Sequence, residues 1–226
     1  MARVLAVGDC HAPVMLREYP NFLEKVAEKY KTNKTVMIGD VADNCAMSFH
    51  TKSAGLRDPV AEYERACEQI AELTSRFPYA HWLLGNHDCL PQRQLEVVGV
   101  PESFLSKPGK IWKTGRWKIY ERYSDLIIDG CIYRHGDKGR GGRMAALTAA
   151  KQEFSSLIQG HHHQQGGVEW FRNKRGTIFG CQTGCGVDHE AGAMSYGRRF
   201  AAKPVLGCAV IIDGEQAVFE PMRVKK

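Results

Sequence analysis

Aspartate, asparagine and histidine side chains gather at five places in this chain, and each place directly follows a short apolar run. The five segments are Asp9-Cys10-His11, Asp40-Val41-Ala42-Asp43-Asn44, Asn86-His87-Asp88, His135 and His161-His162-His163. A lone Asp in such a place is more often a helix cap. Carboxylate, amide and imidazole groups at five run ends together favour a site for a pair of divalent cations.

Three of these residues suit the centre of such a site. Asp9 and His11 are two positions apart in an extended segment, so both side chains project to one side and can hold one cation. Asp40 is the natural bridge between two cations, because its run is expected to lie beside the first. Asn86 and His135 offer a neutral amide oxygen and an imidazole as further ligands.

The run of three histidines lies inside the chain and follows an apolar segment, which argues against a purification tag. His161 and His163 project to the same side and are both predicted ligands. His162 projects the other way, so we expect it to pack or to face solvent.

The apolar runs are predicted to be buried strands, whose ends are where α/β folds place chemistry. Helices are expected over residues 17–31 and from Pro59 to just before Pro78, so the first half predicts a β-α-β-α-β unit with parallel strands. The second half has shorter runs, hairpin signals at residues 173–176 and 213–216, and a helix over residues 142–154. We expect it to form a mainly antiparallel sheet packed on the first. Residues 1–226 are expected to form a single domain.

The composition is that of a protein with a sizeable core. Apolar residues make up 43% of the 226, and no stretch approaches the roughly 18 apolar residues of a membrane span. The chain starts almost directly with a strand, so we expect no signal peptide and a cytoplasmic location. The eight cysteines lack metal-site spacing and are expected to be reduced, with Cys10 and Cys89 as packing residues. The net charge of +6 suits an anionic substrate.

In their order along residues 8–163, these motifs resemble the full motif set of calcineurin-like metallophosphoesterases. The matching residues are Asp9-x-His11, Gly39-Asp40-x-x-Asp43, Gly85-Asn86-His87-Asp88, His135 and Gly160-His161-x-His163. The resemblance implies an α/β fold, a four-layer α-β-β-α sandwich with two mixed sheets and a dinuclear metal site at the strand ends. It also implies two sets of ligands, Asp9, His11, Asp40 and His163 for one cation and Asp40, Asn86, His135 and His161 for the other. Manganese (Mn2+) is the expected metal, although Fe, Zn, Ni and Co suit similar ligands.

The same resemblance implies a metal-dependent phosphoester hydrolase with a metal-bridging hydroxide as the nucleophile. His87 is then a catalytic residue and not a ligand. It contacts the substrate phosphate and, when protonated, stabilises or protonates the leaving oxygen. Asp43 is implied to orient the His87 ring and to favour its charged form.

The chain departs from the protein Ser/Thr phosphatase branch of that family at Ala12, Asn44, Leu84 and Asp88. Asn44 and Leu84 stand where that branch has the two arginines that grip a phosphomonoester. A dianionic monoester would lose its bidentate partner, whereas a diester carries one charge less and depends less on arginine. The departures favour a phosphodiesterase acting on nucleic acid, a nucleotide or a cyclic phosphodiester, which includes a nuclease.

Cations outside the motifs are candidates for binding substrate. Lys138, Arg140 and Arg143 lie in a glycine-rich loop after His135, and Arg198 lies in an arginine- and aromatic-rich segment. We expect these residues and Asn44 to contact substrate, with the cations on phosphates that flank the scissile bond. The alternative interpretations give these segments no role in binding. The first would then be a solvated surface turn, and the second a basic loop that closes the second sheet.

Two other functions stay open. The chain could be a phosphomonoesterase, including a protein phosphatase, or a catalytically silent scaffold of the same fold. None of the motif positions is missing, which disfavours the scaffold. The expected partner is a phosphoester substrate, such as nucleic acid or a nucleotide, with no membrane partner, and the sequence leaves the oligomeric state open.

Overall fold

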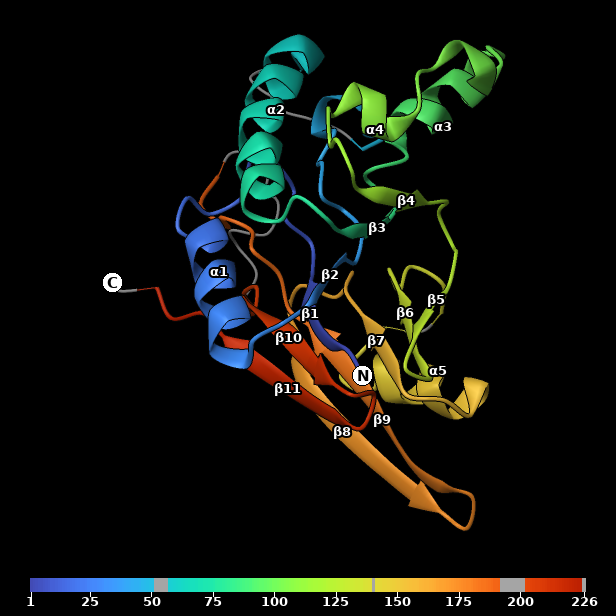
Figure 1. The fold of residues 1–226 in the computed structure, drawn as a ribbon. Coiled ribbons are helices and arrows are strands. Elements are labelled where there is room, and N and C mark those ends of the chain that lie inside the picture. Colours follow the sequence, from blue (N-terminus) through green and yellow to red (C-terminus); the bar gives the residue numbers. More distant parts are fainter. Residues whose placement is uncertain (51–56, 140, 192–201, 225–226) are drawn as a thin grey trace.

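Two β-sheets stack face to face, and helices cover the outer face of each (Figure 1). The computed structural model describes residues 1–50, 57–139, 141–191 and 202–224. The layers run helix, sheet, sheet, helix, which confirms the expected four-layer α-β-β-α sandwich with two mixed sheets.

The first sheet has six strands in the order β11-β10-β1-β2-β3-β4. These strands are β1 (Arg3–Val7), β2 (Lys34–Met37), β3 (His81–Leu83), β4 (Lys118–Tyr120), β10 (Gly207–Ile212) and β11 (Gln216–Pro221). Strands β1 to β4 are parallel, and β10 joins the other edge of β1 in the antiparallel direction. The parallel strands bring their carboxyl ends to one edge of the sheet.

Side chains of β1 alternate between two apolar layers. Val4 and Ala6 pack in the core between the two sheets, whereas Leu5 and Val7 pack against the helices on the outer face. All four side chains are buried. A strand that is apolar on both faces is what a central strand of such a sandwich requires, and it explains the unbroken apolar run in the sequence.

Helices α1 (Tyr19–Tyr30) and α2 (Pro59–Arg76) cover the outer face of the first sheet, close to the expected limits. The Asp58 carboxylate caps α2 by accepting from the N–H groups of Val60 and Ala61. The buried face of α2 follows helical spacing through Ala66, Ile70 and Leu73.

The second sheet has five strands in the order β5-β6-β7-β9-β8. They are β5 (Leu126–Ile128), β6 (Cys131–Arg134), β7 (Leu157–Gln159), β8 (Gly166–Asn173) and β9 (Gly176–Thr183). Helix α5 (Ala145–Glu153) covers the outer face through Ala146 and Ala150, which pack on Ile132 and Leu157.

The expectation of a mainly antiparallel second sheet is wrong. Strands β6, β7 and β9 are parallel, and the strands β4, β10 and β11 of the second half join the first sheet. The two expected hairpins, β8–β9 and β10–β11, do form, but they end in different sheets. Runs of three to six residues show where strands lie, and they carry no information on which distant strand each one pairs with.

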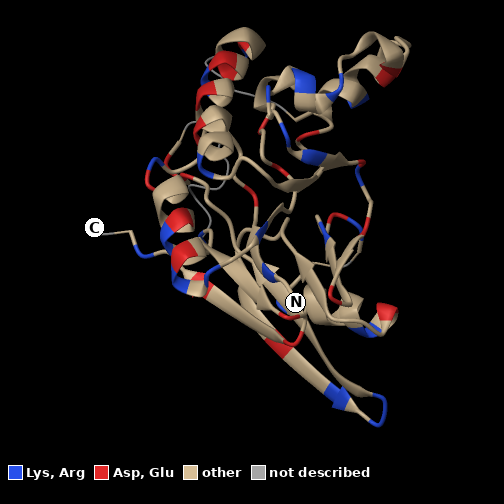
Figure 2. Cartoon of the chain, viewed as in Figure 1, with Lys and Arg blue, Asp and Glu red and all other residues tan. Residues whose placement is uncertain are grey.

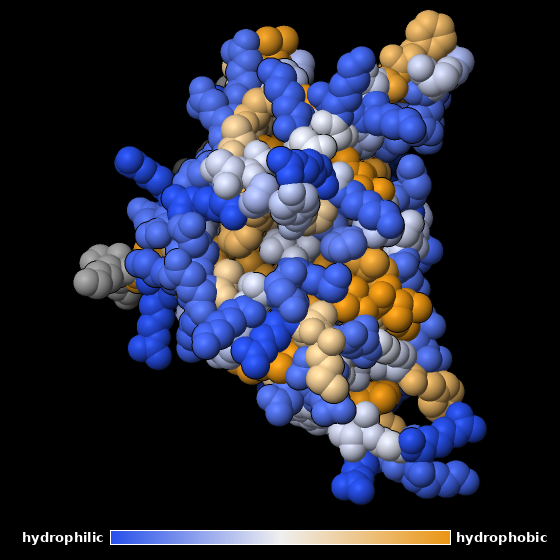
Figure 3. Space-filling view, viewed as in Figure 1, coloured by the Kyte–Doolittle hydropathy of each residue, from blue (hydrophilic) through white to orange (hydrophobic). Residues whose placement is uncertain are grey.

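A helical segment projects beside the strand ends of the first sheet (Figure 1). It comprises α3 (Leu90–Val97), a 3-10 helix (Glu102–Phe104) and α4 (Pro108–Ile111), and a further 3-10 helix (Cys45–Met47) lies against α3. Val97, Val98 and Phe104 are exposed, and Figure 3 shows apolar surface at the outer end of this segment. Among the described residues, no helix combines the length and the apolar character that spanning a bilayer would require.

Candidate active site

Five strands deliver polar side chains to one edge of the sandwich. The segments after β1, β2 and β3 come from the first sheet, and those after β6 and β7 come from the second. The expected convergence of the five run ends therefore occurs, across the boundary between two sheets. Both sheets contribute because parallel neighbours in each end at the same edge.

The backbone is held in an uncommon conformation at several of these positions. His11, Asp40, Asn44 and His161 have φ angles of 51°, 47°, 51° and 65°, in the left-handed region that non-glycine residues rarely adopt. Each such residue costs on the order of 1–3 kcal/mol and persists where the surroundings over-determine it. The site is thus built from main-chain turns that point side chains inward.

Glycines let these turns approach one another closely. Gly39 has a φ of +88°, and a Cβ there would lie 2.4 Å from Nδ1 of His135. A Cβ on Gly85 would lie 2.2 Å from Oδ1 of Asp40 and 2.6 Å from its backbone nitrogen. Any side chain at either position would displace a residue of the site.

Asp9, His11 and His163 form the first cluster of candidate ligands, with one ligand atom from each within 4.8 Å of the others. Nε2 of His163 lies 2.9 Å from Oδ2 of Asp9 and 3.1 Å from Nε2 of His11. Oδ1 of Asp9 accepts a hydrogen bond from the backbone N–H of His161 at 2.9 Å. This fixes the carboxylate so that its other oxygen faces the imidazoles.

Asp40, His135 and His161 form the second cluster. Nε2 of His135 lies 3.2 Å from Oδ2 of Asp40 and 3.0 Å from the amide oxygen of Asn86. The same Asp40 oxygen lies 3.8 Å from Nε2 of His11 in the first cluster. Asp40 therefore reaches both clusters, the position that a bridging ligand needs.

The donor set fits divalent cations. Nδ1 of His11 donates to Oδ1 of Asp43 at 2.7 Å, and Nδ1 of His135 donates to the carbonyl of Ile38 at 2.8 Å. When these rings are neutral, the two bonds favour the tautomer with the proton on Nδ1, which leaves a lone pair on each Nε2 atom facing carboxylates. An anchored Nδ1–H with a free Nε2 is the usual arrangement of a metal-binding histidine.

The electrostatic field of the clusters favours positive charge. Burial alone would lower the pKa of His135, but the carboxylates of Asp40 and Asp9 raise it to about 10. Burial would raise the pKa of Asp9, but the hydrogen bond from His163 and the positive charges of His163 and His135 lower it to about 2. A proton on His135 thus takes the position where a cation would be held.

His87 and Asp43 lie beside the first cluster. Nδ1 of His87 is 3.0 Å from Oδ1 of Asp43 and 2.8 Å from the Asp43 carbonyl, and the His87 side chain is 30% exposed. Burial opposes protonation of this ring, but Asp43 and Asp40 outweigh burial and raise the pKa of His87 to about 10. In the absence of metal, the two carboxylates therefore favour the protonated form of the His87 ring.

Sequence reasoning missed the part that Asp88 plays. This buried carboxylate accepts hydrogen bonds from the N–H of Ala42 at 2.9 Å, the N–H of Gly85 at 2.8 Å and the indole of Trp82 at 3.1 Å. It ties the turn after β2 to the turn after β3. Burial and the charge of Asp40 raise the pKa of Asp88 to about 7. Its position directly after His87 at a strand end was the signal available in the sequence.

An open cavity of about 440 Å3 leads to the clusters. The cavity is lined by Asp40 from the segment after β2, by Asn86 and His87 from the segment after β3, by residues 161–165 from the segment after β7, and by Gly142. His162 is part-buried on this wall, and its Nε2 atom is buried without a hydrogen-bond partner among the described residues.

The five residues expected to bind substrate lie in different places. The buried Asn44 donates its side-chain amide to the carbonyl of His87 at 3.0 Å, so it supports the turn that carries His87. Lys138 lies 4.5 Å over the Tyr123 ring and borders a separate cavity of about 210 Å3 behind His135. Arg143 pairs with Glu169 and its side chain is 84% exposed. Arg140 and Arg198 lie outside the described residues.

The model of the calcineurin-like phosphoesterase family matches residues 2–178. A comparison with curated protein sequences gave no match. Among solved structures, a Vps29 single mutant from Entamoeba histolytica is 13% identical, with 98% of this chain and 99% of that chain covered and a TM-score of 0.44. YfcE, a phosphoesterase from E. coli, is 14% identical, with coverage of 84% and 83% and a TM-score of 0.40. TT1561 of Thermus thermophilus is 10% identical, with coverage of 98% and 99% and a TM-score of 0.42.

Proposed function

Since the chain belongs to the calcineurin-like phosphoesterase family, we propose that it is a metal-dependent phosphodiesterase acting on nucleic acid, a nucleotide or a cyclic phosphodiester. Asp9, His11, Asp40 and His163 would hold one divalent cation, and Asp40, Asn86, His135 and His161 a second, with manganese as the first choice. When bound, the two cations would neutralise phosphate charge and activate a water molecule.

The observation that carries the choice of a diester is the charge of the cavity wall. Among the described residues that line the cavity, His87 is the one side chain outside the ligand clusters with a raised pKa, and none is an arginine or a lysine. A phosphomonoester brings two negative charges and is usually gripped by arginine, whereas a diester brings one. One imidazolium beside two cations suits the smaller charge.

His87 is proposed to act on the leaving oxygen. Its Nδ1 atom is taken by Asp43, and the ring lines the cavity, so Nε2 is the atom that remains for substrate. The backbone N–H of His87 donates to Oδ1 of Asp40 at 2.7 Å, and the Asn44 amide donates to the His87 carbonyl. These two bonds fix the main chain of His87, and Asp43 fixes its ring. A fixed imidazolium can stabilise or protonate the alkoxide that develops as the phosphoester bond breaks.

Paired assays with bis(p-nitrophenyl) phosphate and p-nitrophenyl phosphate, with manganese added, test this proposal. We expect turnover of both, with the larger kcat/KM for the diester. A Glu72→Gln variant is the matched control, because this carboxylate pairs with Arg76 near the end of α2 and lines none of the cavities beside the clusters. A larger kcat/KM for the monoester would overturn the diester proposal. Absence of turnover of either ester with any divalent metal would favour the silent scaffold.

A further inference from the structure

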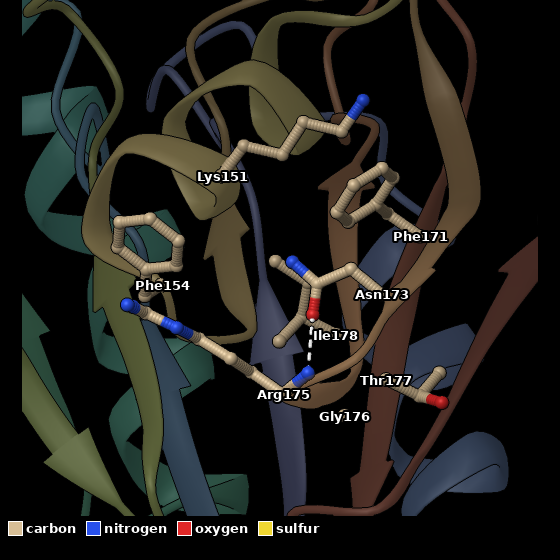
Figure 4. A pocket seen from close by; sticks show the side chains of 8 residues that line it. All are labelled: Lys151, Phe154, Phe171, Asn173, Arg175, Gly176, Thr177 and Ile178. Carbon is tan, nitrogen blue, oxygen red and sulfur yellow. Dashed lines mark hydrogen bonds between the residues drawn. The ribbon is translucent and has the colours of Figure 1, made fainter.

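A second cavity, of about 340 Å3, lies between the end of α5 and the tip of the β8–β9 hairpin (Figure 4). It shares no lining residue with the cavity over the clusters. Strands β7 and β9 are parallel, and this cavity lies at their amino ends, whereas the histidine run follows the carboxyl end of β7. The two cavities therefore lie at opposite ends of the strands of the second sheet.

The cavity exists because the hairpin is longer than the strand beside it. Pairing of β9 with β7 begins at Gly180, so residues 176–178 extend past the start of β7. Phe171 and Ile178 face each other across the hairpin and line the cavity. The opposite wall is Phe154, which ends α5 in the left-handed conformation and is 64% exposed.

A cationic side chain lies over each of the two aromatic rings of the cavity. Nζ of Lys151 lies 4.2 Å from the centre of the Phe171 ring, and the guanidinium carbon of Arg175 lies 4.9 Å from the centre of the Phe154 ring. Figure 4 shows both side chains at the rim, with the Asn173 amide oxygen bound to the Arg175 backbone N–H at 2.8 Å.

The surrounding surface is basic. Arg172 and Lys174 extend the positive charge along the hairpin tip, and Figure 2 shows Lys and Arg gathered there without an acidic residue on the tip. In the described part of the chain, no carboxylate lies within 4.0 Å of Lys151, Arg172, Lys174 or Arg175. Lys151 and Arg175 are the two of these cations that line the cavity, so their charges are available to an anion bound there.

We propose that this cavity binds one nucleotide unit, with the base against Phe154 and Phe171 and the phosphate on Lys151 and Arg175. The volume lies in the range of pockets that hold small ligands. Aromatic rings beside unpaired cations are the combination that binds a base and its phosphate together, because every base has a π-face. The proposal is independent of hydrolysis at the clusters.

Titration of the protein as purified, followed by 1H–15N NMR, tests the proposal and locates the binding. Adenosine 5′-monophosphate should shift the amide signals of residues 171–178. Adenosine and ribose 5-phosphate, which each lack one half of the ligand, should bind at least ~10-fold more weakly. A phosphorothioate-linked tetranucleotide of deoxyadenosine resists hydrolysis and shows whether the bound nucleotide unit is free or part of a strand. Tighter binding than that of the mononucleotide indicates a strand, and equal binding indicates a free nucleotide.

Variants separate the cavity from the general charge of the surface. Phe171→Ala and Arg175→Ala should each weaken mononucleotide binding by ~10-fold. Phe154→Ala should do the same. Because the Phe154 side chain is exposed, a folding defect would not explain weaker binding by this variant. Trp170→Ala is the aromatic control, because Trp170 packs on Phe179 and does not line the cavity, and Arg172→Ala is the control for charge. Both controls should stay within about twofold of the wild type.

Three results would overturn the proposal. The first is binding of ribose 5-phosphate as tight as that of the mononucleotide, which would mean that no base is recognised. The second is an absence of signal shifts in residues 171–178. The third is equal losses in the cavity variants and in their controls. Hydrolysis of the aryl diester by a protein that gives any of these results would leave the proposed function standing.

Discussion

Oδ1 of Asp43 lies 2.7 Å from Nδ1 of His11. The same oxygen lies 3.0 Å from Nδ1 of His87, so one carboxylate atom holds a candidate ligand and the candidate catalytic residue. Burial would raise the pKa of Asp43, but its hydrogen bonds to the two histidines lower it to about 2. The candidate ligand His11 and the candidate catalytic residue His87 are thereby coupled through a single side chain, a link that the expected pairing of Asp43 with His87 did not include.

Replacing His87 should remove catalysis and spare the metals. In His87→Asn all seven candidate ligands remain, while the imidazole that lines the cavity is lost. We expect turnover of the aryl diester to fall by ~10²–10⁴-fold, the usual contribution of a positioned acid. Steady-state kinetics and elemental analysis measure the two quantities. His162→Asn, which changes another histidine of the same wall, should keep most of the turnover; wild-type turnover in His87→Asn would show that the role given to His87 is wrong.

Replacing Asp40 should reduce metal content. Asp40→Asn removes the negative charge that reaches both clusters, and elemental analysis of the purified variant should show a loss of bound metal relative to the Glu72→Gln control. A carboxylate binds a divalent cation through a negatively charged oxygen, whereas an amide oxygen is neutral, so asparagine is the weaker bridging ligand. Full metal occupancy in Asp40→Asn would contradict the bridging position.

Asp88→Asn should loosen the site without touching a candidate ligand. The carboxylate accepts three N–H groups, and an amide has one oxygen, so at least one buried donor loses its acceptor. We expect a loss of about 1–3 kcal/mol in the free energy of unfolding. Urea unfolding followed by tryptophan fluorescence measures it. An unchanged unfolding midpoint would mean that these three bonds are replaced by water.

The stability of the metal-free protein should depend on pH in two windows. His87 and His135 have pKa values raised from 6.5 to about 10, so the stability that they contribute is complete below pH 6.5 and is lost as pH rises through about 10. Asp9 and Asp43 have pKa values lowered from 3.8 to about 2, so their contribution is complete above pH 3.8 and is lost as pH falls through about 2. Urea midpoints should therefore fall as pH is raised through the alkaline window and as it is lowered through the acid window.

Bound metal should remove much of the alkaline dependence. A divalent cation replaces the protons on the imidazoles, so its stabilising effect should increase with pH. His50→Asn, an exposed histidine outside the clusters, should leave the profile unchanged. An alkaline window that is the same in His87→Asn and in the wild type would exclude His87 as a contributor.

Thiol labelling should reach few of the eight cysteines. Burial raises the pKa of Cys131 to about 11 and those of Cys181 and Cys185 to about 12, and Cys10, Cys89 and Cys208 are buried as well. Thiolate is the reactive form, so iodoacetamide at pH 8 should label the part-buried Cys45 and Cys67 first. Mass spectrometry of peptides gives the sites. Rapid labelling of Cys181 in the folded protein would contradict this order.

The strand ends could be predicted from the sequence because each apolar run reports on its own burial. Residues such as Val4 and Leu5 reveal a strand that is covered on both faces, and the polar residues that follow reveal its functional end. The two hairpins were readable from their turn residues for the same local reason. The family resemblance supplied the layer order, which no local pattern contains.

Features that depend on distant pairing could not be predicted in this way. Nothing in the run Cys208 to Ile212 indicates that it pairs with residues 3–6 and not with the neighbouring half of the chain. Asn44 was expected to contact substrate, but a turn in the left-handed region places it under His87, and the sequence does not reveal that turn. The three hydrogen bonds of Asp88 likewise join turns that are far apart in the chain.

The pairing of β1 has a consequence for the order in which the protein is made. One neighbour of β1, strand β2, follows within about thirty residues, whereas the other, β10, begins at Gly207. During translation all seven candidate ligands leave the ribosome while one edge of the strand that leads to Asp9 is still open. An open apolar edge is a template for pairing with other chains. A ribosome stalled shortly before Gly207 would therefore present a nascent chain that contains all seven candidate metal-ligating residues and is prone to aggregate.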